Sequence, residues 1–112
     1  MKIYHNPRCS KSRQTLELIH KSGKKVEVIA YLETPPTFEE LKSIIASLGI
    51  SPEQLLRKSE TLYKEQFKGK SYSNDEWIQI LIENPKLIER PIVVDGKTAV
   101  LGRPPENVLA IL

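Results

Sequence analysis

One cysteine stands in a segment whose neighbours suit nucleophilic chemistry. Cys9 lies in the stretch "YHNPRCSKSRQT", inside a C-x-x-S tetrad, with Arg8, Lys11 and Arg13 beside it and His5 four residues upstream. A turn between a strand and a helix places a side chain near free backbone N–H groups and the positive end of the helix dipole. Cations in the same place favour a thiolate further. The segment therefore predicts a cysteine with a lowered pKa, next to a pocket for an anion.

The lone cysteine also has a plainer interpretation, because a free cysteine is often just a small buried apolar residue. Its position between the first strand and the first helix argues for the reactive alternative. We expect Ser12 to donate a hydrogen bond to the sulfur and Pro7 to stiffen the loop. Since the chain has a single cysteine, any redox role for Cys9 must use a thiol from another molecule.

The elements that would hold Cys9 form a β-α-β unit over residues 2–31. "KIYHN" is typical of a short strand, and apolar residues at near-helical spacing follow Cys9 as far as Ser22, where Gly23 suits the helix end. "KVEVIAYL", residues 25–32, is a dense β-branched run that predicts a strand buried within a sheet. A right-handed parallel crossover is the expected connection.

The middle of the chain is predicted to be helical. Thr37 with Glu40 forms a capping box before a helix that Gly49 ends. Ser51-Pro52 indicates a second helix start, and a third begins at Ser73 and closes at Asn84-Pro85. Residues 60–72 give no clear prediction.

The last third returns to a sheet. "PIVVDGKTAVL" is two apolar runs around Asp95-Gly96, a strong hairpin signal, and "GRPPENVLAIL" predicts a closing apolar helix. The element order is therefore β-α-β, helices, β-β-α. It predicts an α/β fold of thioredoxin-like topology, one domain over residues 1–112, with a helical insertion at about 36–88.

The composition and charge of the chain limit the kinds of binding partner that we expect. The 112 residues carry a net charge of +3, from 17 basic and 14 acidic residues mixed along the chain. No block of like charge predicts nucleic-acid binding, and no apolar run reaches the roughly 18 residues that a membrane span needs. The start of the chain shows no secretory signal, so we expect a cytoplasmic protein that binds neither nucleic acid nor membrane.

Several motifs together resemble the glutaredoxin-coupled arsenate reductase family, which is related to the Spx-like proteins. They occur in order along nearly the whole chain: "YHNPRCSKSRQTLELI", "YLETPP", "LLRK" and "ERPIVVDGKTAVLGRPPENVL". The resemblance implies that Cys9 is the nucleophile, with His5 and Ser12 associated with it. It implies oxyanion-binding roles for Arg57, Arg90 and Arg103, and a cis-proline at Pro91.

Each of these residues has an ordinary alternative when taken alone. Arg57 would suit a helix C-terminus for dipole reasons, and charged residues such as Arg90 and Arg103 are common at strand boundaries. His5 alone would be a strand-end residue, and Pro91 could start an edge strand as a trans residue. Taken together, the three arginines make a stronger case for an oxyanion site, because guanidinium groups offer paired donors for tetrahedral oxyanions.

The family chemistry explains why the second cysteine of a C-x-x-C is not needed. It implies that the Cys9 thiolate attacks arsenate, that glutathione reacts as co-substrate with the adduct, and that glutaredoxin completes the reduction. No bound cofactor and no metal are implied. Ser10 and Lys11 differ from the usual family residues, which leaves room for a paralogue of other specificity. Two alternatives stay open: an Spx-like regulator that binds RNA polymerase, and a thiol-dependent reductase of another substrate, such as a glutathione mixed disulfide.

Overall fold

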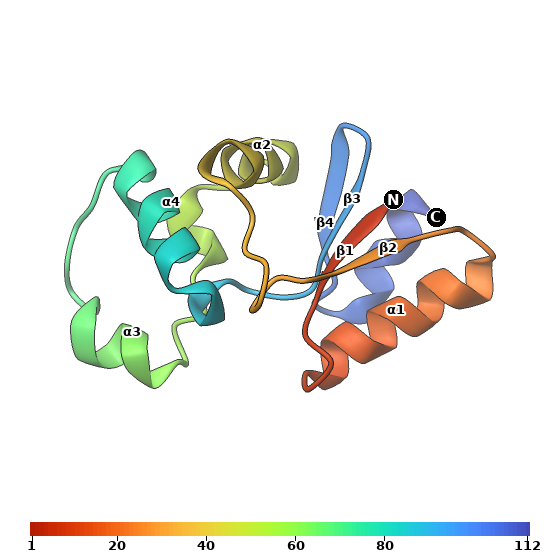
Figure 1. The fold of residues 1–112 in the computed structure, drawn as a ribbon, viewed down its shortest axis with the longest axis horizontal. Helices are drawn as coiled ribbons and strands as arrows, with labels where there is room; N and C mark the ends of the chain where they lie inside the picture. The colour runs from red at the N-terminus through yellow and green to blue at the C-terminus, as the bar shows by residue number, and fades with distance from the viewer. The chain divides into compact units, whose positions relative to one another are not determined.

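The computed structural model describes residues 1–112, which gather into two compact units (Figure 1). The first unit comprises Met1–Thr34 and Arg90–Leu112, and the second comprises Pro35–Glu89. The second unit thus begins and ends within one residue of the insertion expected at about 36–88. That the whole chain acts as one domain stays a prediction.

The first unit is a four-stranded mixed sheet with helices. Its elements are β1 (Lys2–His5), α1 (Ser10–Ser22), β2 (Glu27–Ala30), β3 (Ile92–Asp95), β4 (Thr98–Leu101) and the 3-10 helix η3 (Pro105–Ile111). The strand order is β2-β1-β3-β4. β1 pairs with β2 in parallel and with β3 antiparallel, and β3 pairs with β4 antiparallel. The predicted α/β fold and the β-α-β and β-β-α halves are therefore confirmed. The closing helix differs from expectation only in being a 3-10 helix.

One apolar cluster holds α1 and η3 against the sheet. Ile3 and Val93, which face each other across β1 and β3, are fully buried with Ile19 of α1 and Val108 of η3. Burying each such side chain contributes roughly 1.5–3 kcal/mol. This packing fixes the position of α1, and with it the position of the residue that precedes α1.

The prediction that residues 25–32 form a strand buried within the sheet was wrong in one respect. β2 lies at the edge of the sheet, and Val28 keeps 46% of its surface exposed. β-Branched residues favour extended backbone, and an edge strand is as extended as a central strand. A run of such residues therefore predicts a strand but not its place in the sheet. The outer edge of β2 is therefore available to solvent or to a ligand.

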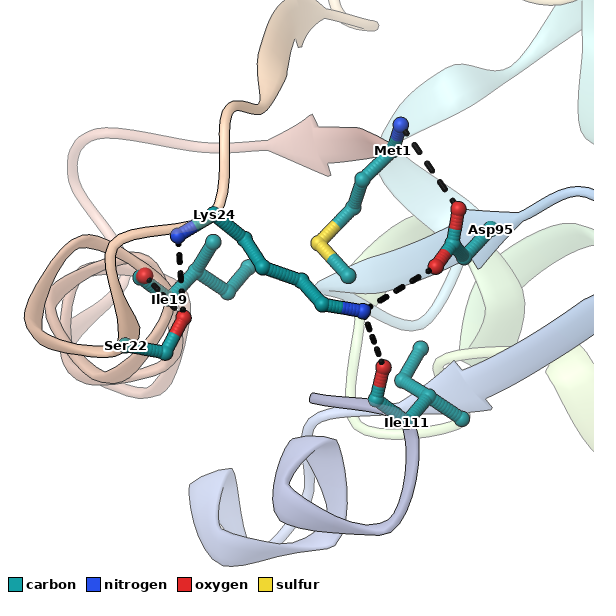
Figure 2. A network of polar contacts seen from close by, with 6 residues as sticks. All are labelled: Met1, Ile19, Ser22, Lys24, Asp95 and Ile111. Atoms are coloured by element: carbon teal, nitrogen blue, oxygen red, sulfur yellow. Dashed lines mark hydrogen bonds and ion pairs between the residues drawn. The ribbon is translucent and has the colours of Figure 1, made fainter.

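A polar network ties the end of α1 to the other end of the chain (Figure 2). α1 ends at Gly23, whose φ of +82° is in the left-handed region that glycine adopts easily. The Lys24 Nζ donates to the carbonyl of Ile111 at 3.2 Å and pairs with Asp95 Oδ2 at 3.5 Å. The amino group of Met1 lies 3.8 Å from the other oxygen of Asp95. Lys24 and Asp95 thus link four segments that are far apart in the sequence.

The second unit is helical. Its elements are α2 (Phe38–Leu48), η1 (Pro52–Leu55), α3 (Thr61–Gln66), α4 (Asn74–Glu83) and η2 (Pro85–Leu87). The capping boxes predicted at Thr37 and at Ser73 are both present. The helix predicted to start at Ser51 is only the short 3-10 helix η1. Residues 60–72, for which the sequence gave no clear prediction, contain α3. No helix of the chain combines the length and the apolar character needed to cross a bilayer.

Candidate active site

Cys9 occupies the position that the sequence predicted, at the entrance of α1. It is the N-cap residue, with extended backbone at φ −95° and ψ 121°. Its N–H donates to the Asn6 carbonyl at 3.0 Å, and its own carbonyl accepts from the Arg13 N–H at 3.0 Å. These two bonds hold the residue between the loop and the first helical turn. Its side chain is partly exposed, as a nucleophile requires.

The surroundings of the sulfur favour the thiolate. Burial opposes ionisation of Cys9, but the backbone N–H groups of Ser12 and Lys11 and the guanidinium of Arg90 outweigh it, so the pKa of the thiol is lowered. The helix N-terminus therefore acts as expected. The cation at the sulfur is Arg90, whereas the neighbour Arg13 donates instead to the carbonyl of Pro7 at 2.9 Å.

Ser12 contributes its backbone amide to the sulfur, and its hydroxyl is engaged elsewhere. The Oγ lies 2.6 Å from His5 Nδ1 and accepts from the Asn6 N–H at 3.1 Å. The donor in the contact with His5 is the Ser12 hydroxyl or the ring N–H, according to the tautomer of His5. At the sulfur, the backbone N–H of Ser12 helps to lower the pKa of Cys9, and a bond from its hydroxyl to the sulfur stays a prediction.

His5 is a neutral residue in this arrangement. Burial, and after it the positive charge of Arg13, lower the pKa of His5. A neutral imidazole offers one N–H donor and one acceptor, and does not act as a cation beside the thiolate. The association of His5 with Cys9 that the family resemblance implies stays a prediction.

Asn6 is a site residue that the sequence reasoning missed. It is 7% exposed, and it makes three hydrogen bonds within the loop. Its N–H donates to Ser12, its carbonyl accepts from Cys9, and its Oδ1 accepts from the Arg8 N–H at 3.0 Å. The last bond is an Asx-type turn, which an asparagine followed by proline often forms. The Asn-Pro pair was therefore the feature of the sequence from which this turn could have been predicted.

The same end of the sheet, where β3 begins beside the end of β1, brings two of the predicted arginines to one place. Arg90 directly precedes β3, and the Arg90–Pro91 peptide bond is cis, as is Arg103–Pro104. The Gly102 N–H donates to the Pro91 carbonyl at 2.9 Å, and Arg103 Nη1 donates to the Arg90 carbonyl at 3.2 Å. Arg90 also keeps a buried Nε with no hydrogen-bond partner. Cys9, Arg90 and Arg103 thus share one end of the first unit.

Arg57 belongs to the second unit, so its part in the site stays a prediction. Its N–H donates to the Leu87 carbonyl at 2.7 Å, and its Nε lies 3.7 Å from Glu60 Oε2. That Nε is buried and makes no hydrogen bond, as at Arg90. A buried guanidinium N–H that makes no hydrogen bond within the protein is suited to binding an anionic ligand.

The sheet order, the helix that begins just after Cys9, and the cis proline before β3 define a thioredoxin-like fold with a single cysteine at the entrance of its first helix. No group of three or more histidine, cysteine or acidic side chains is arranged to hold a metal ion. The chain belongs to the ArsC family, whose sequence profile matches residues 4–111.

Known proteins resemble the chain over its full length. A protein of Escherichia coli K12 called YfgD, described as uncharacterized, is 50% identical over 100% of this chain and 96% of its own. A protein of Neisseria meningitidis serogroup A named arsenate reductase is 44% identical, over 100% of this chain and 97% of its own. The solved structure titled arsenate reductase from Vibrio cholerae superposes with a TM-score of 0.94 at 51% identity. It covers 100% of this chain and 98% of that one.

Proposed function

We propose that the protein is an arsenate reductase that forms a covalent adduct on Cys9 and takes its electrons from glutathione and glutaredoxin. The observation that carries this proposal is the set of donors around the sulfur: the amides of Lys11 and Ser12 and the guanidinium of Arg90. The same set suits a thiolate and a bound oxyanion. Relatives that carry the name arsenate reductase make arsenate the substrate of choice.

In the first step the Cys9 thiolate attacks the arsenic of arsenate. An S–As bond forms, an As–O bond breaks, and the departing oxygen leaves as water after protonation. Nucleophilic catalysis of this kind needs a thiolate that is already ionised at the working pH. The Arg90 guanidinium and the helix amides that stabilise the sulfur are also placed to stabilise the negative oxygens. Arg103 and Arg57 would complete an oxyanion site, as the family resemblance implies.

The reduction itself must use thiols from outside the chain, because Cys9 is the only cysteine. Overall, two glutathione thiols are oxidised to one disulfide, and their two electrons take arsenic from the +5 to the +3 state. One arsenate oxygen leaves as water, and arsenite is released. Glutaredoxin, acting on the glutathione-bound intermediate, returns Cys9 to its thiol. No metal and no bound cofactor takes part.

The proposal is tested by a coupled assay with arsenate, glutathione and glutaredoxin, in which arsenite is measured directly. We expect many turnovers with the complete mixture, and at most one adduct per chain when the thiols are omitted. Thioredoxin alone should serve poorly. Cys9→Ser should abolish turnover but retain anion binding, because Arg90 and the helix amides remain.

Two outcomes would overturn the assignment. Full activity of Cys9→Ala would remove the cysteine from the mechanism. Reduction of a glutathione mixed disulfide in the absence of any arsenate reduction would make the protein a thiol-dependent reductase of another substrate. A thermal melt of each variant separates these results from unfolding, since a merely structural Cys9 would lower the melting temperature when removed.

A further inference from the structure

A buried contact joins α1 to the end of β4, and the reaction steps proposed above give it no part. Thr15 of α1 is fully buried, and Gly102, directly after β4, is buried against it. The Thr15 hydroxyl donates to the Lys11 carbonyl at 2.8 Å and, at 3.4 Å, to the Gly102 carbonyl. Because a buried hydroxyl needs such partners, this contact ties α1 to the chain that leaves the sheet.

Gly102 also contacts the segment that carries Arg90. Its N–H donates to the Pro91 carbonyl at 2.9 Å, just beyond the last pair of β3 and β4. The next residue, Arg103, donates from Nη1 to the Arg90 carbonyl at 3.2 Å. The main chain around Arg90 is therefore fixed to Gly102, and through Gly102 to Thr15.

The space at residue 102 has no room for a side chain. A Cβ there would lie 2.7 Å from Pro91 Cγ and 3.0 Å from Thr15 Cγ2, with Thr15 Oγ1 closer still. The bare backbone of Gly102 is therefore a spacer between the side chains of Thr15 and Pro91. Cys9 caps α1, and Arg90 directly precedes Pro91. The sulfur and the guanidinium beside it thus come from opposite sides of this spacer.

We propose that Thr15 and Gly102 are positioning residues that hold the Arg90 guanidinium at the Cys9 sulfur. The Arg90 side chain donates a hydrogen bond to the sulfur, and such a charge-assisted bond weakens when its distance or alignment changes. The inference deepens the function proposed above and rests on it in one respect. The same guanidinium is there to hold the oxyanion, so a displaced Arg90 would slow turnover as well.

The test follows thiolate absorbance against pH in the protein without substrate, and compares the midpoints. Thr15→Val keeps the shape of the side chain and removes the hydroxyl, so the midpoint should rise as the bond from Arg90 weakens. Thr15→Ser keeps the hydroxyl and should keep the midpoint of the parent protein. Gly102→Ala inserts a methyl group between α1 and Pro91 and should also raise the midpoint. Each rise should be smaller than that of Arg90→Met, because the guanidinium is displaced and not removed.

Two comparisons separate this role from a general loss of structure. In an Arg90→Met background, Thr15→Val and Gly102→Ala should leave the midpoint unchanged, because they act through Arg90. Gly96→Ala is the matched control at the other end of the same hairpin, where the glycine has a φ of +62°. It should lower stability without moving the midpoint. The other charged or titratable groups around Cys9 are the same in all of these proteins: His5, Arg8, Lys11, Arg13 and Arg103.

A midpoint in Thr15→Val equal to that of the parent protein would overturn the inference, and so would equal rises with and without Arg90. A thermal melt shows which variants are folded during the titration. If Gly102→Ala does not fold, Thr15→Val and Thr15→Ser decide the question. Because the titration needs no arsenate, it stands apart from the coupled assay. The expected midpoints without arsenate reduction would count against the function alone, and reduction with unmoved midpoints would count against the positioning role alone.

Discussion

His5 Nδ1 lies 2.6 Å from Ser12 Oγ, so the end of β1 is joined to the first turn of α1 through two buried side chains. The Asn6 N–H donates to the same oxygen. This junction sets the shape of the loop that presents Cys9. It also gives His5 and Ser12 a positioning role that is distinct from contact with the sulfur.

Replacing Ser12 with alanine should cost stability more than thiolate character. The change leaves the Asn6 N–H and the His5 ring nitrogen buried without a partner, which costs about 1–3 kcal/mol of the free energy of unfolding. The backbone N–H of residue 12 stays in place, so the pKa of Cys9 should change little. Urea denaturation and thiolate absorbance measure the two effects. Ser43→Ala, at an exposed position of α2, is the matched control. A large rise in the thiol pKa with unchanged stability would contradict this assignment.

Arg90→Met should raise the pKa of Cys9, because it removes the cation and a hydrogen-bond donor at the sulfur. Ultraviolet absorbance of the thiolate, followed against pH, gives the midpoint. Arg8→Ala removes a cation that adjoins Cys9 in the sequence, and it should leave the midpoint near that of the parent. If Arg8 proved to be the stronger influence, the placement of Arg90 would be wrong.

The lowered pKa of Cys9 also predicts how stability depends on pH. Between the folded pKa and the higher ordinary value, the unfolded chain binds more protons than the folded chain. The free energy of unfolding should therefore rise as the pH increases through this window, and the gain should be lost as the pH falls through the folded pKa. Melting curves of the parent and Cys9→Ser, compared over that window, measure the difference. Parallel curves would mean that the pKa of Cys9 is not lowered by folding.

His5 should titrate below its ordinary range, since burial and the charge of Arg13 both lower its pKa. Its imidazole C–H resonances, followed by NMR against pH, give the midpoint directly. The neutral form contributes stability above the unfolded pKa, and that stability should be lost as the pH falls through the folded value. A His5 midpoint at or above its ordinary value of 6.5 would contradict a neutral role.

Gly102→Ala should destabilise the end of the sheet that carries the arginines. A Cβ at this position would lie 2.7 Å from Pro91 Cγ and against Thr15 Oγ1. Overpacking of this kind costs about 1–3 kcal/mol of the free energy of unfolding. In a Thr15→Ala background one of the two clashes is gone, so the cost measured by denaturation should shrink without vanishing. If the effects of Gly102→Ala and Thr15→Ala on the free energy of unfolding simply added, Thr15 would not be what limits the space at residue 102.

Arg57→Lys should weaken arsenate binding if this residue completes the oxyanion site. Lysine keeps the charge but cannot form the paired donors of a guanidinium. Protection of Cys9 from alkylation by added arsenate measures binding without turnover. Lys58→Ala, at the exposed neighbouring position, should behave like the parent protein. Unchanged protection in Arg57→Lys would remove this arginine from the site.

The sequence alone determined the features that depend on short-range chemistry. The capping boxes at Thr37 and Ser73, the helix end at Gly23 and the turn at Asp95-Gly96 were all predicted, because caps and tight turns are decided by a few adjacent residues. The place of Cys9 at the entrance of α1 followed in the same way. The single cysteine also showed that no disulfide can form within the chain.

The tertiary structure decided which groups meet. Arg90 lies 81 residues from Cys9 in the sequence and acts on its sulfur, while the nearer Arg13 turns to the Pro7 carbonyl. The hydroxyl of Ser12 joins His5 because β1 and α1 come together there. Likewise, β2 is an edge strand only because the sheet grows on the other side of β1. Such contacts arise from the packing of distant segments, which local sequence patterns do not encode, and those at the sulfur lower the pKa of Cys9.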